Sequence, residues 1–270
     1  MPPAPATMLA LPQVTLCAVS SVNVAATIRA LELSMAQITF GEVLLFTDVD
    51  VPVLFPEADP AIRVVPIARL TSSAAYSAFL LERLAEYVTT SHCLVTQWDG
   101  HVIDARRWRP EFLKYDYVGA SWPQFGDGHD VGNGGFSLRS RALLEACRSP
   151  DFNAHHPEDV AIGRTNRARL EERGLRFAPR GQADAFAAER AGDPADSFGY
   201  HGVFLMPEVL GLEDFWQVYR SLDERSSLRP DFRDLLYATS RGHRPLLRAL
   251  HMIWMRGRDA VAKRTLRKSG

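Results

Sequence analysis

Short, almost wholly apolar runs alternate with amphipathic segments through the N-terminal part of this chain. Segments 24–37 and 73–88 carry apolar residues at helical spacing, as amphipathic helices do. Strands that alternate with helices predict an α/β domain, in which ligands bind beyond the carboxyl ends of the strands. Four runs have the composition of strands buried on both faces of a parallel sheet: residues 14–19, 42–46, 62–67 and 92–96.

The length and charge of the chain are those of one globular protein. It has 270 residues, and its 31 Lys and Arg nearly balance its 32 Asp and Glu, which argues against binding to nucleic acid. We expect a flexible leader over residues 1–11, an α/β domain over 12–210 and a helical extension over 211–270. No run reaches the roughly 20 apolar residues that a membrane span needs.

The cysteines and the N-terminal residues indicate the cellular compartment of the protein. Cys17, Cys93 and Cys147 lie far apart and show no CxxC spacing, which favours reduced thiols. The first residues lack the basic and long apolar regions of a signal peptide. We therefore expect a cytoplasmic protein.

An acidic residue follows the apolar run 92–96, in the sequence QWDG. A carboxylate at the end of a strand, such as that of Asp99, can hold a divalent cation and leave positions free for phosphate oxygens. Asp-Gly is also a common turn, so a turn without a ligand is the alternative.

A glycine-rich run, VGNGGFSLRS, covers residues 131–140. Its glycines allow φ > 0 and a close approach of the backbone to a ligand, after which FSLRS predicts a short strand that leads into a helix. The spacing is not that of a dinucleotide-binding fingerprint. A glycine-rich hairpin is the alternative.

Two later segments carry groups that suit acid–base chemistry or metal binding. Glu158 and Asp159 are adjacent carboxylates, and one of them can act as a general base while the other caps a helix. The alternative is a plain helix cap. His201 lies in FGYHG, where small neighbours leave room for a Mn²⁺-like cation, although a single His is more often structural.

The runs TQWDG, YDYVGASW, VGNGGFSLRS, PEDV and FGYHG, in this order, resemble a widespread family of uncharacterised glycosyltransferase-like domains. The resemblance covers roughly residues 12–207. It implies the α/β glycosyltransferase-A fold, a Rossmann-like mixed sheet between layers of helices. It also implies a catalytic domain that moves a sugar from a nucleoside-diphosphate sugar to a glycan or lipid-linked acceptor.

The resemblance also assigns a metal site. It places Asp99 at the last acid of the DxD motif, which holds Mn²⁺ or Mg²⁺ against the diphosphate of the donor, and it places His201 at the C-terminal ligand that completes this site. Gln97 stands where the first acid would be, which weakens metal binding. The same resemblance places Gly134 and Gly135 beside the donor sugar.

For catalysis, the resemblance places Asp159 at the acid that deprotonates the acceptor, with Glu158 as the alternate. Direct attack assisted by such a base inverts the anomeric centre, but a retaining enzyme can have the same fold. An inactive sugar- or nucleotide-binding protein is one rival, suggested by Gln97. A nucleotide-sugar hydrolase is the other.

Polar side chains at the ends of the first two predicted strands suit contacts to a nucleotide. Helix capping is the alternative for the Ser and Asn residues among them. Aromatic rings such as those of Trp98, Trp122 and Tyr117 can stack on a sugar or base, or lie in the core. We expect the donor to contact Ser20, Ser21, Asn23, Thr47, Asp48, Gln97, Trp98, Asn133, Gly134 and Gly135.

The C-terminal segment 241–270 differs from the rest of the chain in charge. It holds nine Lys or Arg and one acid, Asp259, a net +8, so that the other residues carry −9 of the total of −1. Apolar residues, including Trp254, alternate with the basic ones. This pattern predicts either an interfacial helix at the inner face of a membrane or a terminal helix packed on the catalytic domain.

Overall fold

The structure of the protein is a computed structural model. It describes residues 8–268, with side chains as far as residue 261. The chain separates into two compact units, Met1–Gly202 and Val203–Gly270. The division after Gly202 precedes the boundary after residue 210 that the sequence suggested. Residues 203–210 belong with the C-terminal helices, because α8 (Met206–Val209) packs on α9 (Leu212–Ser221) and α10 (Phe232–Thr239).

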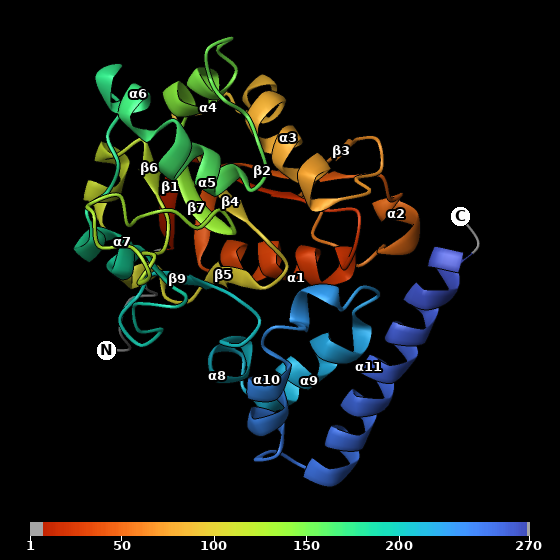
Figure 1. The fold of residues 1–270 in the computed structure, drawn as a ribbon. Coiled ribbons are helices and arrows are strands. Elements are labelled where there is room, and N and C mark those ends of the chain that lie inside the picture. The colour runs from red at the N-terminus through yellow and green to blue at the C-terminus, as the bar shows by residue number, and fades with distance from the viewer. Residues whose placement is uncertain (1–7, 269–270) are drawn as a thin grey trace, which may run out of the picture. The chain divides into compact units, whose positions relative to one another are not determined.

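A six-stranded mixed sheet forms the centre of the first unit (Figure 1). Its strand order is β3-β2-β1-β4-β7-β6. The first four of these strands are parallel, whereas β7 is antiparallel to both β4 and β6. The predicted α/β fold class, a mixed sheet between helices, is confirmed. The strands are β1 (Leu9–Val19), β2 (Ile38–Thr47), β3 (Arg63–Pro66), β4 (His92–Thr96), β6 (Tyr117–Val118) and β7 (Phe136–Ser140).

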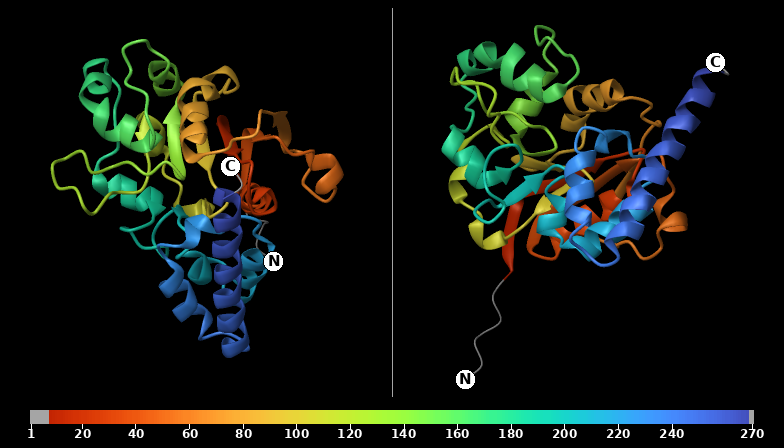
Figure 2. Two further views of the ribbon diagram at one scale, coloured as in Figure 1. Left: turned by 45° about the vertical axis from the view of Figure 1, so that its right-hand side comes forward. Right: turned by 60° about the horizontal axis from the view of Figure 1, so that its bottom comes forward.

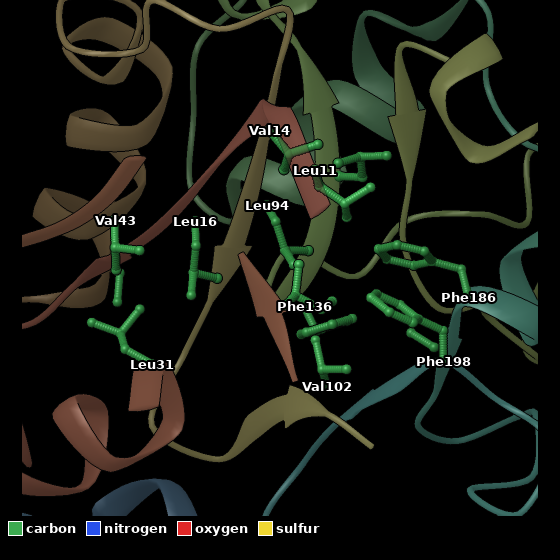
Figure 3. Packing of buried hydrophobic residues seen from close by; sticks show 14 of the residues in the cluster. Leu11, Val14, Leu16, Leu31, Val43, Leu94, Val102, Phe136, Phe186 and Phe198 are labelled. Atoms are coloured by element: carbon green, nitrogen blue, oxygen red, sulfur yellow. The ribbon is translucent and has the colours of Figure 1, made fainter. Parts of the chain in front are cut away.

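Both faces of this sheet are buried, as the apolar runs predicted. Leu16 of β1 packs toward α1 (Val24–Met35), in a cluster that also contains Phe136, Phe186 and Phe198 (Figure 3). The next residue, Cys17, packs on the opposite face, toward α3 (Ser73–Glu82) and α4 (Arg141–Cys147). The two layers of helices are visible in Figures 1 and 2. Successive side chains of a strand point to opposite faces, so a strand buried on both faces must be apolar throughout.

The predicted leader of residues 1–11 is wrong for its last residues. β1 begins at Leu9, and residues 9–11 pair in parallel with residues 38–40 of β2. The pairing shifts register between Leu11 and Thr15, around Pro12, which has no N–H to donate. The strand therefore continues through Pro12 and begins five residues before the apolar run 14–19. Residues 1–7 of the predicted leader lie outside the described residues.

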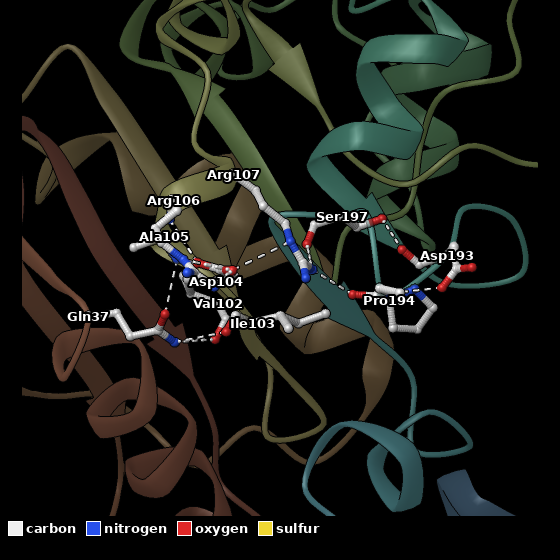
Figure 4. Close-up of polar contacts among 11 residues, drawn as sticks. Gln37, Val102, Ile103, Asp104, Ala105, Arg106, Arg107, Asp193, Pro194 and Ser197 are labelled. Carbon is white, nitrogen blue, oxygen red and sulfur yellow. Dashed lines mark hydrogen bonds and ion pairs between the residues drawn. The ribbon is translucent and has the colours of Figure 1, made fainter.

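A second, small sheet has the strand order β5-β9-β8. Its strands are β5 (Gly100–Val102), β8 (Ala187–Ala188) and β9 (Gly199–His201). Figure 4 shows the polar contacts around it. The Gln37 amide donates to the carbonyl oxygens of Val102 and Ile103, while the Arg107 guanidinium donates to those of Pro194 and Ser197. These bonds fix both β5 and the segment that precedes β9.

Shorter helical pieces complete the first unit. The helix predicted over 73–88 ends at Glu82 and continues as a 3₁₀ turn, Leu84–Glu86. All three cysteines are free and buried, in agreement with reduced thiols. The remaining pieces are α2 (Val51–Leu54), α5 (Glu158–Val160), α6 (Arg167–Glu172), α7 (Arg180–Phe186), the 3₁₀ segments Ala105–Arg107 and Pro110–Lys114, and the π-helical turn Ala161–Thr165.

The second unit is helical, as predicted. Besides α8, α9 and α10 it contains a 3₁₀ turn, Ser226–Leu228, and the long helix α11 (Pro245–Lys268). α10 begins at Phe232, after this 3₁₀ turn, so the predicted extension consists of several short helices before α11. Phe215, Leu235 and Met252 are buried in this unit. Among the described residues, no helix has the length and apolar character needed to cross a membrane.

Candidate active site

A cavity of about 390 Å³ lies at the carboxyl end of β4. Its volume is within the range of small-molecule sites. Seven of the residues predicted for the site line it, namely Gln97, Asn133, Gly134, Gly135, Glu158, Asp159 and His201. The other lining residues are Ser73, Tyr76, Trp122, Gln124, His156, Pro157, Glu189 and Arg190.

The small sheet brings Asp99 and His201 together. Gly100 of β5 pairs directly with His201 of β9, and the Gly202 N–H donates to the Asp99 carbonyl oxygen. As a result, Asp99 Oδ1 lies 3.4 Å from His201 Nε2. Gly100 permits this pairing, because a Cβ there would lie 2.7 Å from the carbonyl oxygen of Tyr200. Two residues about a hundred positions apart in the chain thus face each other; His201 lines the cavity, whereas Asp99 is buried and does not line it.

The imidazole of His201 lies between two carboxylates. Its Nδ1 is 3.2 Å from Glu189 Oε1, on the side opposite Asp99. Burial lowers the pKa of His201, but the Asp99 and Glu189 carboxylates outweigh burial, so the pKa lies well above its ordinary value. Glu189 also accepts a hydrogen bond from the Asn133 side-chain amide. Glu189 therefore fixes the ring and leaves Nε2 directed toward Asp99.

The side-chain amide oxygen of Gln97 also lies near His201 Nε2. Gln97 Nε2 donates to the Tyr76 hydroxyl at 2.9 Å, and Gln97 Oε1 lies 3.4 Å from His201 Nε2. Asp99 Oδ1 is buried and makes no hydrogen bond to the described residues. The nearest partner of this oxygen is the His201 imidazole, whose raised pKa favours the protonated ring and hence an ion pair with Asp99.

A divalent cation held by these three atoms requires the neutral form of His201, because a ligating imidazole nitrogen carries no proton. The 3.4 Å separations are close to the roughly 3 Å between neighbouring ligands of an octahedral ion. Within residues 8–268, no three His, Cys, Asp or Glu side chains form a group that could hold a metal. A cation here would therefore have one carboxylate, one imidazole and one amide oxygen as protein ligands.

The glycine run fits between side chains that line the cavity. A Cβ on Gly134 would lie 2.2 Å from Glu158 Oε1, and one on Gly135 would lie 2.0 Å from His201 Nε2. Neither glycine has a positive φ; that conformation belongs to Asn133, at φ 50°. The sequence interpretation that the glycines supply φ > 0 is therefore wrong. They are required because the backbone runs against the site residues themselves.

Glu158 is held by two partners. One of its carboxylate oxygens accepts from the Ser77 hydroxyl at 2.9 Å, and the other accepts from Arg139 Nη2 at 3.3 Å. Arg139 is fully buried and its guanidinium lies over the Tyr117 ring. The Arg139 side chain is therefore enclosed by the protein and does not reach solvent. Glu158 and Arg139 form a buried ion pair behind the cavity wall.

Asp159 is placed differently, although it is the next residue. It is half-buried, and its Oδ1 accepts from the Val160 N–H at 2.8 Å. Burial and the neighbouring Glu158 raise its pKa, while backbone N–H groups of Val160 and Gly134 partly oppose this. The surroundings of Asp159 therefore favour its protonated form. Such a group suits proton transfer.

The polar residues after β1 and β2 do not line this cavity. The Ser20 hydroxyl donates to the Val22 carbonyl oxygen, Ser21 Oγ accepts from the Leu70 N–H at 2.9 Å, and Thr47 Oγ1 accepts from the Val49 N–H at 3.2 Å. Asn23 precedes α1 in a left-handed conformation, without a side-chain cap to that helix.

Asp48 and Trp98 also lie outside the lining of the cavity. Asp48 is exposed, and Trp98 is half-buried. Trp122, in contrast, lines the cavity and packs on Gly132, where a Cβ would lie 1.9 Å from the indole ring. Of the three rings considered for stacking, Trp122 alone meets the cavity, because Tyr117 is fully buried.

Sequence reasoning missed several residues of the site. Glu189 follows β8, a strand of only two residues, in a segment (AAER) that carries no recognisable signal. Tyr76 and Ser77 lie in the middle of α3, in a segment that the sequence predicted only as a helix. Only their contacts with Gln97 and Glu158 reveal their place in the site.

Solved structures resemble this chain only loosely. An active-site mutant of LgtC matches with a TM-score of 0.44 and 15% identity, over 82% of this chain and 99% of that one. The apo form of the glycosyltransferase GlyE from Streptococcus pneumoniae TIGR4 matches with a TM-score of 0.35 and 14% identity, over 53% and 36%. HddC from Yersinia pseudotuberculosis matches with a TM-score of 0.34 and 14% identity, over 53% and 80%. Likeness at this level assigns no activity.

No curated protein matches the sequence. A protein family does match, over residues 60–201, which is more than half of the chain. The matched segment runs from before β3 to His201, and it contains Gln97, Asp99, the glycine run and the Glu158–Asp159 pair. The chain belongs to the family described as "Protein of unknown function (DUF5672)".

Proposed function

We propose that this protein is a glycosyltransferase that moves a sugar from a nucleoside-diphosphate sugar to a hydroxyl of a glycan or lipid-linked acceptor. The observation that carries the proposal is the buried pair of Asp99 Oδ1 and His201 Nε2, 3.4 Å apart, since His201 lines the same cavity as Asp159. Glycosyl transfer needs a place for a diphosphate and its counter-charge beside a base for the acceptor. The cavity offers both kinds of group.

Asp99, His201 and the Gln97 amide oxygen are the proposed ligands of Mn²⁺ or Mg²⁺. Such a cation, when bound, neutralises charge on the departing diphosphate. The protein's own part is to aim the ligands: Tyr76 sets the Gln97 amide, and Glu189 sets the His201 ring. Gln97 thus keeps an oxygen where the resemblance has an acid, at the cost of one negative charge.

Asp159 is the proposed base for the acceptor hydroxyl. Its half-buried position in the cavity wall and its raised pKa suit a group that takes up a proton. Glu158 is a poorer candidate than the sequence suggested, because Ser77 and Arg139 occupy its two oxygens. We assign Glu158 the role of holding the segment that carries Asp159.

The donor sugar is proposed to lie against the glycine run and Trp122. Gly134, Gly135 and Asn133 form this wall, and the indole offers an apolar face on which a sugar ring can stack. Asn23 and Asp48 remain proposed nucleotide contacts, whereas the Ser20, Ser21 and Thr47 hydroxyls are engaged with the backbone. They follow β1 and β2, whose carboxyl ends share the sheet edge with that of β4.

A thermal-shift and calorimetric screen of nucleotide sugars, with and without Mn²⁺, tests the proposal. We expect one donor class to bind, more tightly with Mn²⁺, and this gain to disappear in Asp99→Ala and His201→Ala. Binding with no turnover on any acceptor would favour a sugar- or nucleotide-binding protein. Full-rate turnover in water alone would favour a donor hydrolase.

The stereochemistry of the product tests the role of Asp159. Direct attack by an acceptor that Asp159 deprotonates inverts the anomeric centre of the donor sugar. Nuclear magnetic resonance of the product formed from a donor of known configuration reads this out. A retained configuration would remove Asp159 from the simple base role.

A further inference from the structure

The helix α11 carries two apolar faces, and only one of them is packed. Met252 and Met255 are buried against the rest of the second unit, together with the stem of Arg248. On the opposite side lie large apolar residues that are between 53% and 78% exposed: Leu246, Leu247, Leu250, Ile253, Trp254 and Val261. Their spacing of three, four and seven residues places them in one stripe along the helix.

The surroundings of this stripe are basic. Segment 241–270 contains a single acid, Asp259, and that carboxylate is paired with Arg225 and Arg258. The Arg258 guanidinium lies 5.4 Å from the centre of the Trp254 ring. The exposed stripe therefore lies in a segment whose sequence carries a net +8, in which Arg248 is paired with Glu213 and Arg258 with Asp259.

An apolar stripe of this size needs an apolar partner, because exposed contiguous patches usually mark an interaction site. A second copy of α11 would bring another net +8 against it, which opposes pairing. The described part of the first unit exposes few large apolar side chains, Met8, Val22, Val53 and Leu54, and these come from separate elements except for the pair on α2. Neither partner is complementary to the stripe.

We propose that the exposed face of α11 binds the surface of a membrane that contains anionic lipids. Leu250, Ile253 and Trp254 would enter the boundary between headgroups and acyl chains, while the net positive charge of segment 241–270 attracts lipid phosphates. The helix cannot span the bilayer, so it lies along its surface. The proposal is independent of glycosyl transfer.

Flotation of the full-length protein with vesicles tests this proposal. We compare the Leu250→Gln/Trp254→Gln double variant with a control, Val53→Gln/Leu54→Gln, which removes two equally exposed apolar side chains from α2 in the first unit. Vesicles of phosphatidylcholine alone and of phosphatidylcholine with phosphatidylglycerol separate the apolar from the charge contribution. Thermal unfolding of each variant verifies that it is folded.

We expect the wild type and the control to float with anionic vesicles and to be released by high salt. The α11 variant should bind about tenfold more weakly or worse, since each large apolar side chain removed from the interface costs a substantial part of the affinity. Absence of wild-type binding to anionic vesicles would overturn the proposal, as would equal loss in the control. A wild-type dimer in sedimentation velocity that the α11 variant dissociates would instead identify a second copy as the partner.

Discussion

The carboxyl ends of β1 and β2 and the carboxyl end of β4 lie at the same edge of the sheet and carry similar polar residues, yet they differ in one respect. After β1 and β2, the Ser20, Ser21 and Thr47 hydroxyls are engaged in local bonds with the backbone. After β4, the buried Asp99 carboxylate faces the His201 imidazole at 3.4 Å. Hydroxyls engaged with the backbone stabilise the fold without a ligand, whereas a buried carboxylate–imidazole pair next to a cavity is a candidate for binding one.

The first prediction concerns the base that lies across the cavity from the β4 end. Asp159→Asn should lower kcat about 10³-fold, the size typical of a lost general base, with little change in donor binding. Glu158→Gln is the matched neighbour: it weakens the buried ion pair with Arg139 and should lower the melting temperature more than it lowers kcat. Steady-state kinetics and thermal unfolding measure both. The reverse pattern would exchange the roles of the two residues.

The pH dependence of kcat/KM follows from the same residue. Burial favours the protonated form of Asp159, so the active carboxylate forms only at a pH above the ordinary Asp pKa of about 4. The rate should therefore fall as the pH drops through this raised pKa. An acid limb at or below pH 4, or an unchanged limb in the residual activity of Asp159→Asn, would contradict the assignment.

The next largest effect distinguishes the carboxyl end of β4 from those of β1 and β2. Asp99→Asn keeps the shape of the side chain but removes its charge, and kcat/KM and Mn²⁺ affinity should fall about 100-fold, the upper part of the range for changes at metal sites. Ser21→Ala should change both by less than about threefold, since its hydroxyl is engaged with the Leu70 N–H. Comparable losses in the two variants would remove the distinction between the strand ends.

The glycine run gives a smaller effect, on stability. Gly135→Ala forces a Cβ against the His201 ring, and overpacking of this kind costs about 1–3 kcal/mol of unfolding free energy. Gly181→Ala in α7 is the control, because a Cβ there meets nothing within 4 Å. Chemical denaturation should show a loss in the first variant and none in the second. Equal stability would mean that His201 moves freely, contrary to its contact with Glu189.

The smallest effect is expected at the β1 end itself. Ser21→Ala removes one hydrogen bond and should lower the unfolding free energy by about 1 kcal/mol, the typical net value for such a bond. Thr47→Val serves as the comparison at the end of β2. Denaturant titration resolves losses of this size. A stability gain in either variant would show that the hydroxyl is strained in the native state.

Much of the first unit was predictable because its strands are buried on both faces. Apolar runs such as 92–96 have few other interpretations, and β4 was found with its bounds correct. The start of β1 was not, because Pro12 interrupts the pattern while Leu11 is still buried. The small sheet was missed since strands of two or three residues have no periodicity to detect.

The site was predictable in its motifs but not in its contacts. The order of QWDG, the glycine run, PEDV and FGYHG placed most of the cavity wall. The different surroundings of Glu158 and Asp159 depend on Ser77 and Arg139, which are distant in sequence. The orientation of the Gln97 amide likewise depends on Tyr76. Such partners are fixed by tertiary packing, which a local pattern does not record.

The proposed metal site at Asp99 and His201 is tested most directly by an electron paramagnetic resonance titration of Mn²⁺ in the presence of a nucleoside diphosphate. We expect the wild type to bind one Mn²⁺ per chain. Asp99→Asn and His201→Ala should each lose this binding, while Ser21→Ala should keep it. Undiminished Mn²⁺ binding in Asp99→Asn would contradict the proposed site.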